Sequence, residues 1–517
     1  MAGTEGASQP FWAPDSRSVG FFADNKLKRL DLGSGAPQAL APAINTRGGT
    51  WGADGVILFA PTAGKIFRVP ASGGSPVAET TLDRQTAHRF PSFLPDGRHF
   101  LFYAAGSPDT AGIYLGALNA SAPHRLTPAN TGGVYLSSVR GAGSRPDDAR
   151  NASEGGWLLW AREGALVAQR LDVDRSALTG DPVTLADQVV VDQIFTAASA
   201  SASGQVAYRT GAGTRRQLTW LDRSGAARGT VGDADSNVLS SPRVSPDGHR
   251  VAVYRKVQGN TDLWLLDGVR TSRLTFSPAN EQFPVWSPDN SRLAFISSPA
   301  GQLGIYQMPT SGAGAEELIV SPGRTMAPSS WSKDGRYLLY RSIDPQTNSD
   351  LWVVPMEGEH RPWVFLQTPF NEVRAEFSPD GRWVAYESNE SGRMEIYVRP
   401  FVPPGPPGTT PSTAAAQWQV STAGGIAPVW RPDVKELYYL NPAGTMMSAP
   451  IAVSGTTFSA GAPVALFPAH IVGGGLDSSA NRQYDVAPDG RFLINTVMNE
   501  AVAPITLIQH WNPEAKK

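Results

Sequence analysis

Short runs of β-branched and aromatic residues alternate with tight turns along most of this chain. In residues 372–398, three extended runs are separated by turns at 379–381 and 389–392. In the first of these turns proline restricts φ, aspartate can hydrogen-bond to nearby backbone, and glycine tolerates a positive φ. The stretch lacks the 3.6-residue apolar period of an amphipathic helix. The pattern therefore predicts an antiparallel meander of short strands.

The same unit recurs along the chain, and each copy is marked by a turn related to Pro-Asp-Gly. Full or degenerate copies of this turn lie at 14–16, 53–55, 95–97, 246–248, 288–290, 333–335, 379–381, 432–434 and 488–490. Apart from one long gap, neighbouring copies are roughly 40 to 56 residues apart, which is typical of propeller blades when the repeat contains only strands. We predict an all-β fold made of four-stranded antiparallel blades.

The distribution of the repeats predicts two tandem β-propellers. Residues 1–228 would form an N-terminal propeller of about five blades, and residues 229–517 a six-bladed propeller. The boundary is placed here because residues 229–237 are rich in turn formers and the repeat becomes more regular after them. A single ring of eleven blades is the alternative, but it would leave a wide central channel with no evident filler.

The last predicted blade has no obvious fourth strand of its own. Its expected strands are 484–486, 492–494 and 505–508. Because propellers avoid an open sheet edge by borrowing a terminal strand, we expect residues 228–231 to complete this blade.

These residues also carry a family resemblance. The pattern Ser-Pro-Asp-Gly-Arg-x-x-x-Tyr at 378–386 resembles the TolB-like repeat, a WD-like repeat also called PD40. The wider sequence, including segments 3–8, 10–16 and 504–512, is similar to the propeller region that follows the kinase domain in some bacterial serine/threonine kinases. The resemblance implies a sensor or interaction role and an extracytoplasmic or periplasmic location. Kinase sequence motifs are absent, so we expect a propeller without its kinase, with Met1 at the edge of a fragment.

Composition narrows the possible functions. The 53 glycines and 43 prolines suit many short strands joined by turns. A net charge of −2 gives no general attraction to nucleic acid or anionic membranes. There is no apolar segment long enough for a membrane span and no signal-peptide pattern. The absence of cysteine excludes disulfides, thiolate metal sites and cysteine nucleophiles.

Ionisable residues recur where the innermost strand of a blade is expected to begin, seven residues before the turn. With their sequence neighbours, these candidates for a channel mouth are Glu281, Glu372, Arg374, Asn481, Arg482 and, in the first propeller, His88. Two carboxylates with amide neighbours would suit a hard cation such as Ca²⁺ or Mg²⁺, with Glu281 and Glu372 as ligands. The alternative, which is the commoner arrangement, is solvated linings or internal ion pairs that orient the blades. For His88 the corresponding alternative is a structural histidine.

Two further positions repeat with the turn. The position three residues before it includes Arg243, Glu376 and Asp485, which are expected deep in a blade. Tryptophans recur two residues before the turn, and such regular placement predicts packing between blades. These tryptophans are Trp12, Trp51, Trp286, Trp331 and Trp430.

Three functions are compatible with these features. The chain has neither a Gly-x-Ser-x-Gly elbow nor a Walker A sequence. The leading hypothesis is a module that binds a protein, peptide or small-molecule ligand. One alternative is a metal-assisted hydrolase or lyase with its site at a channel mouth. The other is a structural scaffold of an envelope complex, which would bind through a large surface.

Overall fold

The computed structural model describes most of the chain. The described residues are 4, 7–23, 26–33, 35–43, 46–61, 64–107, 109–120, 122–137, 156–192, 195–201, 203–211, 215–235, 237–257, 260–268, 270–321, 323–344, 347–403, 416–455, 457–471, 482–498, 504–509 and 511.

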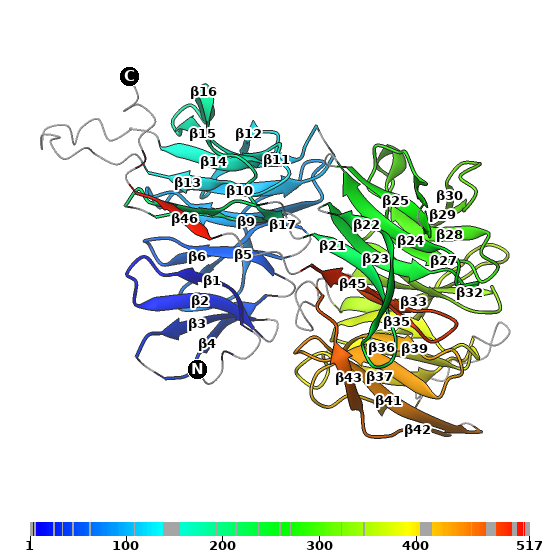
Figure 1. Ribbon diagram of the computed structural model, residues 1–517. Coiled ribbons are helices and arrows are strands. Elements are labelled where there is room, and N and C mark those ends of the chain that lie inside the picture. Colours follow the sequence, from blue (N-terminus) through cyan, green and yellow to red (C-terminus); the bar gives the residue numbers. More distant parts are fainter. Residues whose placement is uncertain are drawn as a thin grey trace, which may run out of the picture. The chain divides into compact units, whose positions relative to one another are not determined.

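The chain divides into two compact units (Figure 1). The first comprises Met1–Gly213 and Ala501–Lys517, and the second comprises Thr214–Glu500. Within the described residues the structure is strand throughout, apart from turns and one short 3₁₀ helix, η2 (Pro299–Gly301). Eleven blade-like antiparallel sheets, five in the first unit and six in the second, confirm the predicted all-β propeller fold. No helix among the described residues is long and apolar enough to cross a membrane.

The sheets of the first unit follow the order of the chain, except for the last strand. They are β1 (Ser8–Trp12), β2 (Ser18–Ala23), β3 (Lys26–Asp31) and β4 (Gln38–Pro42); β5 (Thr46–Trp51), β6 (Val56–Pro61), β7 (Phe67–Pro70) and β8 (Val77–Ala78); β9 (Ala87–Phe93), β10 (His99–Ala105), β11 (Gly112–Ala117) and β12 (His124–Thr127); β13 (Val134–Leu136), β14 (Trp157–Arg162), β15 (Ala165–Asp172) and β16 (Ala177–Ala186); and β19 (Ala198–Ala200), β20 (Val206–Arg209) and β46 (Ile505–Ile508), with a small hairpin of β17 (Val191–Asp192) and β18 (Phe195–Thr196).

The second unit contains six sheets. They are β21 (Arg216–Leu221), β22 (Ala227–Asp235), β44 (Tyr484–Val486) and β45 (Phe492–Val497); β23 (Val238–Val244), β24 (Val251–Val257), β25 (Asn260–Asp267) and β26 (Arg270–Arg273); β27 (Gln282–Trp286), β28 (Arg292–Ser297), β29 (Gly304–Pro309) and β30 (Glu317–Val320); β31 (Met326–Trp331), β32 (Tyr337–Asp344), β33 (Asn348–Pro355) and β34 (Trp363–Leu366); β35 (Glu372–Phe377), β36 (Trp383–Ser388), β37 (Glu395–Pro400) and β38 (Trp418–Gln419); and β39 (Ile426–Trp430), β40 (Glu436–Leu440), β41 (Thr445–Ser454), β42 (Thr457–Ala460) and β43 (Val464–Pro468).

The closing blade of the second unit joins segments far apart in the sequence. Its strand order is β22-β21-β45-β44, so residues 228–231 do supply the outer strand, as predicted. The strand before them, β21, pairs with both β22 and β45 and therefore also belongs to this unit. For this reason the division falls between Gly213 and Thr214 rather than after residue 228.

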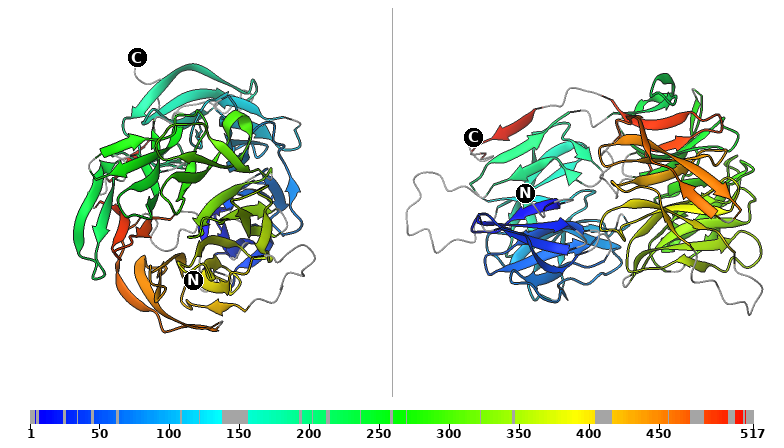
Figure 2. Two further views of the ribbon diagram at one scale, coloured as in Figure 1. Left: turned by 90° about the vertical axis from the view of Figure 1, so that its right-hand side faces the viewer. Right: turned by 90° about the horizontal axis from the view of Figure 1, so that it is seen from below.

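Strand β46 does not belong to the last blade, and that part of the prediction is wrong. It pairs with β20 in the first unit, where Ile508 lies opposite Val206. Figures 1 and 2 show β46 in red among the strands of the first unit. The place that β46 was expected to fill is occupied by β21, which pairs with β45 along its whole length.

The repeated turn is stabilised by its own side chains. In the copy at 378–382, the Ser378 hydroxyl donates to Asp380 at 2.5 Å and accepts the backbone N–H of Trp383 at 2.9 Å. Asp380 also accepts the backbone N–H of Arg382 at 3.1 Å, and Gly381 has a φ of +70°. The serine and aspartate of the Ser-x-Asp-Gly pattern thus accept hydrogen bonds from backbone N–H groups of the same turn.

Tryptophans before the turn pack between blades, as predicted, with one exception. The indole N–H of Trp286 donates to the carbonyl of Arg243 at 2.9 Å, and that of Trp430 to the carbonyl of Glu376 at 3.1 Å. Both acceptors lie in other blades, and both tryptophans are buried. Trp12 occupies the same repeat position but is 61% exposed.

Candidate functional site

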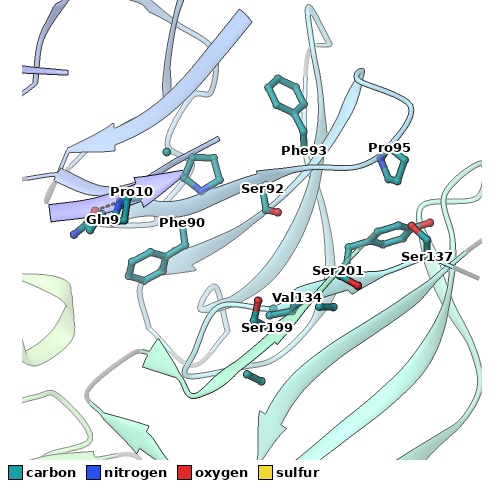
Figure 3. Close-up of a pocket in the computed structure, with 17 residues that line it drawn as sticks. Gln9, Pro10, Phe90, Ser92, Phe93, Pro95, Val134, Ser137, Ser199 and Ser201 are labelled. Atoms are coloured by element: carbon teal, nitrogen blue, oxygen red, sulfur yellow. Dashed lines mark hydrogen bonds between the residues drawn. The ribbon is translucent and has the colours of Figure 1, made fainter. Parts of the chain in front are cut away.

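The first unit contains a cavity of about 530 Å³ (Figure 3). Its walls come from the innermost strands of all five blades, β1, β5, β9, β13 and β19, and from the residues next to them. The lining residues are Gln9, Pro10, Gly48, Gly49, Phe90, Pro91, Ser92, Phe93, Pro95, Gly133, Val134, Tyr135, Ser137, Ala198, Ser199, Ala200 and Ser201. A cavity bordered by every blade lies on the axis of a propeller.

A β-bulge shapes this cavity. The pairing register shifts in β1, β5 and β9, and in each case a residue five positions before the turn has a positive φ. These residues are Gln9 (+49°), Gly48 (+96°) and Phe90 (+55°), and all three line the cavity. A bulge turns a side chain away from the regular alternation of a strand. The bulges therefore direct these positions toward the axis.

Two features allow the strained bulges to persist. The Gln9 side chain donates to the carbonyl of Thr46 at 3.0 Å and accepts the backbone N–H of Gly48, so it ties the first two blades together. At position 48 an added Cβ would lie 3.0 Å from the Cα of Phe90. The residue at this position must also have a positive φ, which is +96° here. Only glycine meets both demands without strain.

The cavity lining combines polar and apolar groups and carries no acidic or basic side chain. Its polar groups are serine hydroxyls, the amide of Gln9 and the phenol of Tyr135, and its apolar surface comes from aromatic rings and prolines. In Figure 3 the hydroxyls of Ser92 and Ser199 point toward each other across the cavity. Burial raises the pKa of Tyr135, with a further contribution from Asp96, so its hydroxyl stays protonated and can donate. Such a surface suits an uncharged ligand.

The structure places Glu281 between its own blade and the preceding one, where its backbone N–H donates to the carbonyl of Thr261 in β25. The carboxylate accepts hydrogen bonds from the hydroxyls of Thr275 at 3.0 Å and Ser297 at 3.3 Å. The residue is fully buried, and burial raises its pKa to about 8. The two hydroxyls oppose this rise, whereas the nearby Glu316 and Asp262 add to it. Glu281 is therefore largely protonated at neutral pH.

Glu372 has an equivalent environment in another blade. Its Oε1 accepts from the hydroxyls of Thr368 at 2.5 Å and Ser388 at 3.4 Å, and burial raises its pKa to about 7. No hydrogen bond or ion pair among the described residues joins it to Glu281. A carboxyl surrounded by hydroxyl donors lacks the cluster of oxygen ligands that Ca²⁺ or Mg²⁺ requires. Within the described residues, no group of three or more acidic or histidine side chains has a metal-binding arrangement. Neither glutamate therefore belongs to such a group.

His88 is buried and lies in β9, one of the cavity strands, but it does not line the cavity. Its Nδ1 is 2.8 Å from the hydroxyl of Thr80, and its ring packs against Phe102 with the centroids 4.6 Å apart. Desolvation lowers the pKa of His88 to about 4, so the imidazole is neutral at physiological pH. This is the geometry of a structural histidine.

The arginines at the predicted mouth form ion pairs. Arg374 donates to both oxygens of Glu387, at 3.0 and 2.8 Å. Arg482 donates to Glu376 at 2.5 Å and lies 3.5 Å from Asp485. Asn481 lies outside the described residues.

Arg482 links residues that share one repeat position. Arg243 lies 3.4 Å from the same Glu376 oxygen, and Asp485 accepts the backbone N–H of Val244 at 2.8 Å. Burial raises the pKa of Asp485, although Arg243 and Arg482 oppose this. We define the axial ion network as Arg243, Glu376, Arg482 and Asp485. Two cations and two carboxylates balance each other, which leaves little charge for a ligand.

None of the described candidates lines the cavity of the first unit. Residues seven before the turn, such as His88 and Glu372, are buried and contact the preceding blade. Residues five before it line the cavity in the first three blades. The sequence signal for them is weak, since the only shared demand is a positive φ, which Gly48 signals and Phe90 does not.

Comparisons with known proteins identify the type of repeat. The family model described as "PD40: TolB beta propeller domain" matches residues 188–348. The "Tol-Pal system protein TolB" of Anaeromyxobacter dehalogenans (strain 2CP-1 / ATCC BAA-258) is 32% identical over 99 residues, which are 18% of this chain and 22% of that protein. The "Uncharacterized peptidase YuxL" of Bacillus subtilis (strain 168) is 26% identical over 196 residues, 29% of each chain. The matches thus span less than a third of these relatives.

Solved structures also align with this chain. A putative TolB from Agrobacterium tumefaciens aligns with a TM-score of 0.40 and 16% identity, covering 54% of this chain and 97% of that one. The tricorn protease aligns with a TM-score of 0.27 and 12% identity, covering 95% of this chain and 53% of that one. Residues 188–348 therefore resemble the TolB-type propeller repeat, and the chain is similar to TolB over part of its length. The similarity to kinase-linked propellers stays a prediction.

Proposed function

We propose that this chain is a binding module whose ligand site is the axial cavity of the first unit. The observation that carries the proposal is the lining, which all five innermost strands supply and which contains hydroxyls, an amide and aromatic rings without a charged group. The volume of about 530 Å³ lies within the usual range for small-ligand sites.

The chemistry of the lining defines the ligand class. Serine hydroxyls both donate and accept hydrogen bonds, and the rings of Phe90, Phe93 and Tyr135 offer apolar surface. A charged ligand would lose its hydration without gaining an opposite charge, which is costly. The ligand would therefore be uncharged and rich in hydroxyl or amide groups, such as a short neutral peptide segment or a neutral sugar.

The test is ligand binding by calorimetry and thermal unfolding. Neutral tetrapeptides and neutral disaccharides form one panel, and their acidic and phosphorylated counterparts form the other. At a hundredfold excess over Kd, a ligand stabilises the folded state by about 2.7 kcal/mol. For a unit of this size that corresponds to a rise in Tm of about 5 to 10 °C.

A matched pair of variants locates the site. Ser199→Trp would fill the cavity and abolish binding, whereas Ser459→Trp, on the exposed surface of β42 in the second unit, would leave it unchanged. If neither panel binds, or if Ser199→Trp binds as tightly as the parent chain, the cavity is not the ligand site.

The family resemblance supports a finer role. A propeller of this kind would act as a sensor domain attached to a bacterial kinase and located outside the cytoplasm. The matched relatives named as TolB of the Tol-Pal system support an interaction role for the fold. Cell fractionation of the native protein, followed by detection with an antibody to the propeller, tests the location. Recovery in the cytosol would contradict it.

A further inference from the structure

The fifth blade of the first unit has an incomplete sheet. Its order is β19-β20-β46, whereas the other four blades of this unit each have a fourth strand that covers the third. Strand β46 is the third strand of this blade and pairs only with β20 among the described residues. Its other edge therefore presents backbone N–H and C=O groups that no described strand satisfies.

The two faces of β46 differ. Thr506 and Ile508 lie opposite Tyr208 and Val206, and Ile508 packs against the core between the fourth and fifth blades. On the other face, Leu507 lies opposite Ala207 and is 52% exposed. Ile505, on the same face as Leu507, is 73% exposed. Ile508 is thus packed, Thr506 is exposed, and the face with Ile505 and Leu507 is open and apolar.

The first blade shows the same lack of packing. Trp12 stands at the repeat position where Trp286 and Trp430 pack against another blade and are only 6% and 4% exposed. Trp12 is 61% exposed. Its strand β1 and the inner strand β19 of the fifth blade border the same axial cavity. Large apolar side chains are therefore left uncovered on the first and the fifth blades.

We propose that the free edge of β46 binds an extended segment of a partner protein, which adds as the fourth strand of the fifth blade. An open edge of backbone groups is recognised by another extended backbone, and side-chain pockets select alternate residues. All strand pairs in the described blades are antiparallel, so the added strand would be antiparallel as well.

The neighbouring blades indicate the chemistry of the partner segment. In the first blade the fourth strand is Gln-Ala-Leu-Ala-Pro, in which Leu40 and Ala41 are buried. Strand β46 is Ile-Thr-Leu-Ile and carries no charge. The partner segment would be about five residues long, uncharged in its centre, with aliphatic residues at alternate positions to contact Ile505 and Leu507.

The experiment uses the full chain and a synthetic peptide of alternating valine and threonine, with a lysine at each end for solubility. A second peptide of the same sequence has alternate backbone amides N-methylated, so it cannot pair as a strand. Binding of the first peptide is expected to be at least about tenfold tighter than binding of the second, a difference of about 1.4 kcal/mol. Hydrogen exchange at residues 504–509 is expected to slow when the first peptide binds.

Two variants provide the matched control. Leu507→Lys is expected to weaken peptide binding at least about tenfold, because a lysine on an edge strand opposes pairing. Val464→Lys, at a 50% exposed aliphatic residue of β43 in the second unit, should leave binding unchanged. Equal binding of both peptides, equal effects of both variants, or backbone amides of 504–509 that are already protected in the free chain would overturn the proposal. Self-association that Leu507→Lys abolishes would instead identify a second copy as the occupant and overturn the choice of partner.

Discussion

Replacing Glu281 with glutamine should make the second unit more stable in alkaline solution. The carboxyl is fully buried, accepts two hydroxyl hydrogen bonds and has a pKa raised to about 8. In the unfolded chain it would titrate near its ordinary value of 4.5. Because the folded pKa is the higher one, the unfolded state loses its proton first. The carboxyl therefore makes its full contribution to the free energy of unfolding below pH 4.5, and this contribution is lost as the pH rises through 8.

The magnitude follows from the pKa difference. At about 1.4 kcal/mol per pH unit, the shift corresponds to a loss of roughly 3 to 5 kcal/mol between pH 4.5 and pH 9. Glutamine has the same shape and stays neutral, so Glu281→Gln should lack this loss. Near pH 5 the variant and the parent should differ by less than about 1 kcal/mol, since the protonated acid and the amide make similar hydrogen bonds.

Urea unfolding at a series of pH values from 5 to 9 measures this effect. With a urea dependence of about 1–3 kcal/mol per molar, the midpoint of the variant should exceed that of the parent by at least about 1 M at pH 9. The control is Glu359→Gln, because the Glu359 side chain is 74% exposed and its replacement should leave the urea midpoint unchanged. Parallel curves for Glu281→Gln and the parent chain across this range would refute the reasoning, because Glu281 would then ionise as an ordinary carboxyl.

Three other predictions follow from packing and charge. Arg482→Met should destabilise the second unit by about 3–5 kcal/mol, because it removes one of the two cations that balance Glu376 and Asp485. Arg361→Met at an exposed ion pair should cost less than about 1 kcal/mol, and equal losses in urea unfolding would contradict the role of the axial ion network. Trp430→Ala should cost about 3–5 kcal/mol and the exposed Trp12→Ala less than about 1 kcal/mol, and thermal unfolding that ranks them in the opposite order would show that the packing differs. Burial lowers the pKa of His88 to about 4, so the neutral imidazole contributes fully to the stability of the first unit above pH 6.5, and this contribution is lost as the pH falls toward 4. His88→Gln should therefore reduce the acid sensitivity of the first unit. An unchanged acid transition in circular dichroism would exclude the effect.

The sequence predicted the blades well because each blade is specified locally. In the turn at 378–382, side chains of the turn itself form the hydrogen bonds that its backbone needs. Tryptophans such as Trp286 stand at a fixed number of residues before their own copy of the turn and pack between blades. The partner of a strand is not specified locally. Strand β46 is a short aliphatic run that would suit the edge of many sheets, so its position in the first unit had no signal within the strand itself.

The candidate site could be predicted only in part, because the bulges alter which side chains face the axis. With regular alternation, positions seven and five before the turn would share a face. The extra residue in the bulge breaks this relation, and Phe90 reaches the cavity while His88 stays in the core. The cavity is lined by neutral side chains, whereas the described ionisable candidates lie in ion pairs or buried hydrogen bonds.

The route of the chain through its two units has a consequence for biosynthesis. The second unit is an insertion within the first, which receives its final strand only from residues 505–508. A ribosome would therefore complete the inserted ring while the earlier, N-terminal part still waits for β46. Until residues 505–508 have been synthesised, one edge of β20 is unpaired and could pair with another nascent strand. Chaperone binding would therefore matter most during this period.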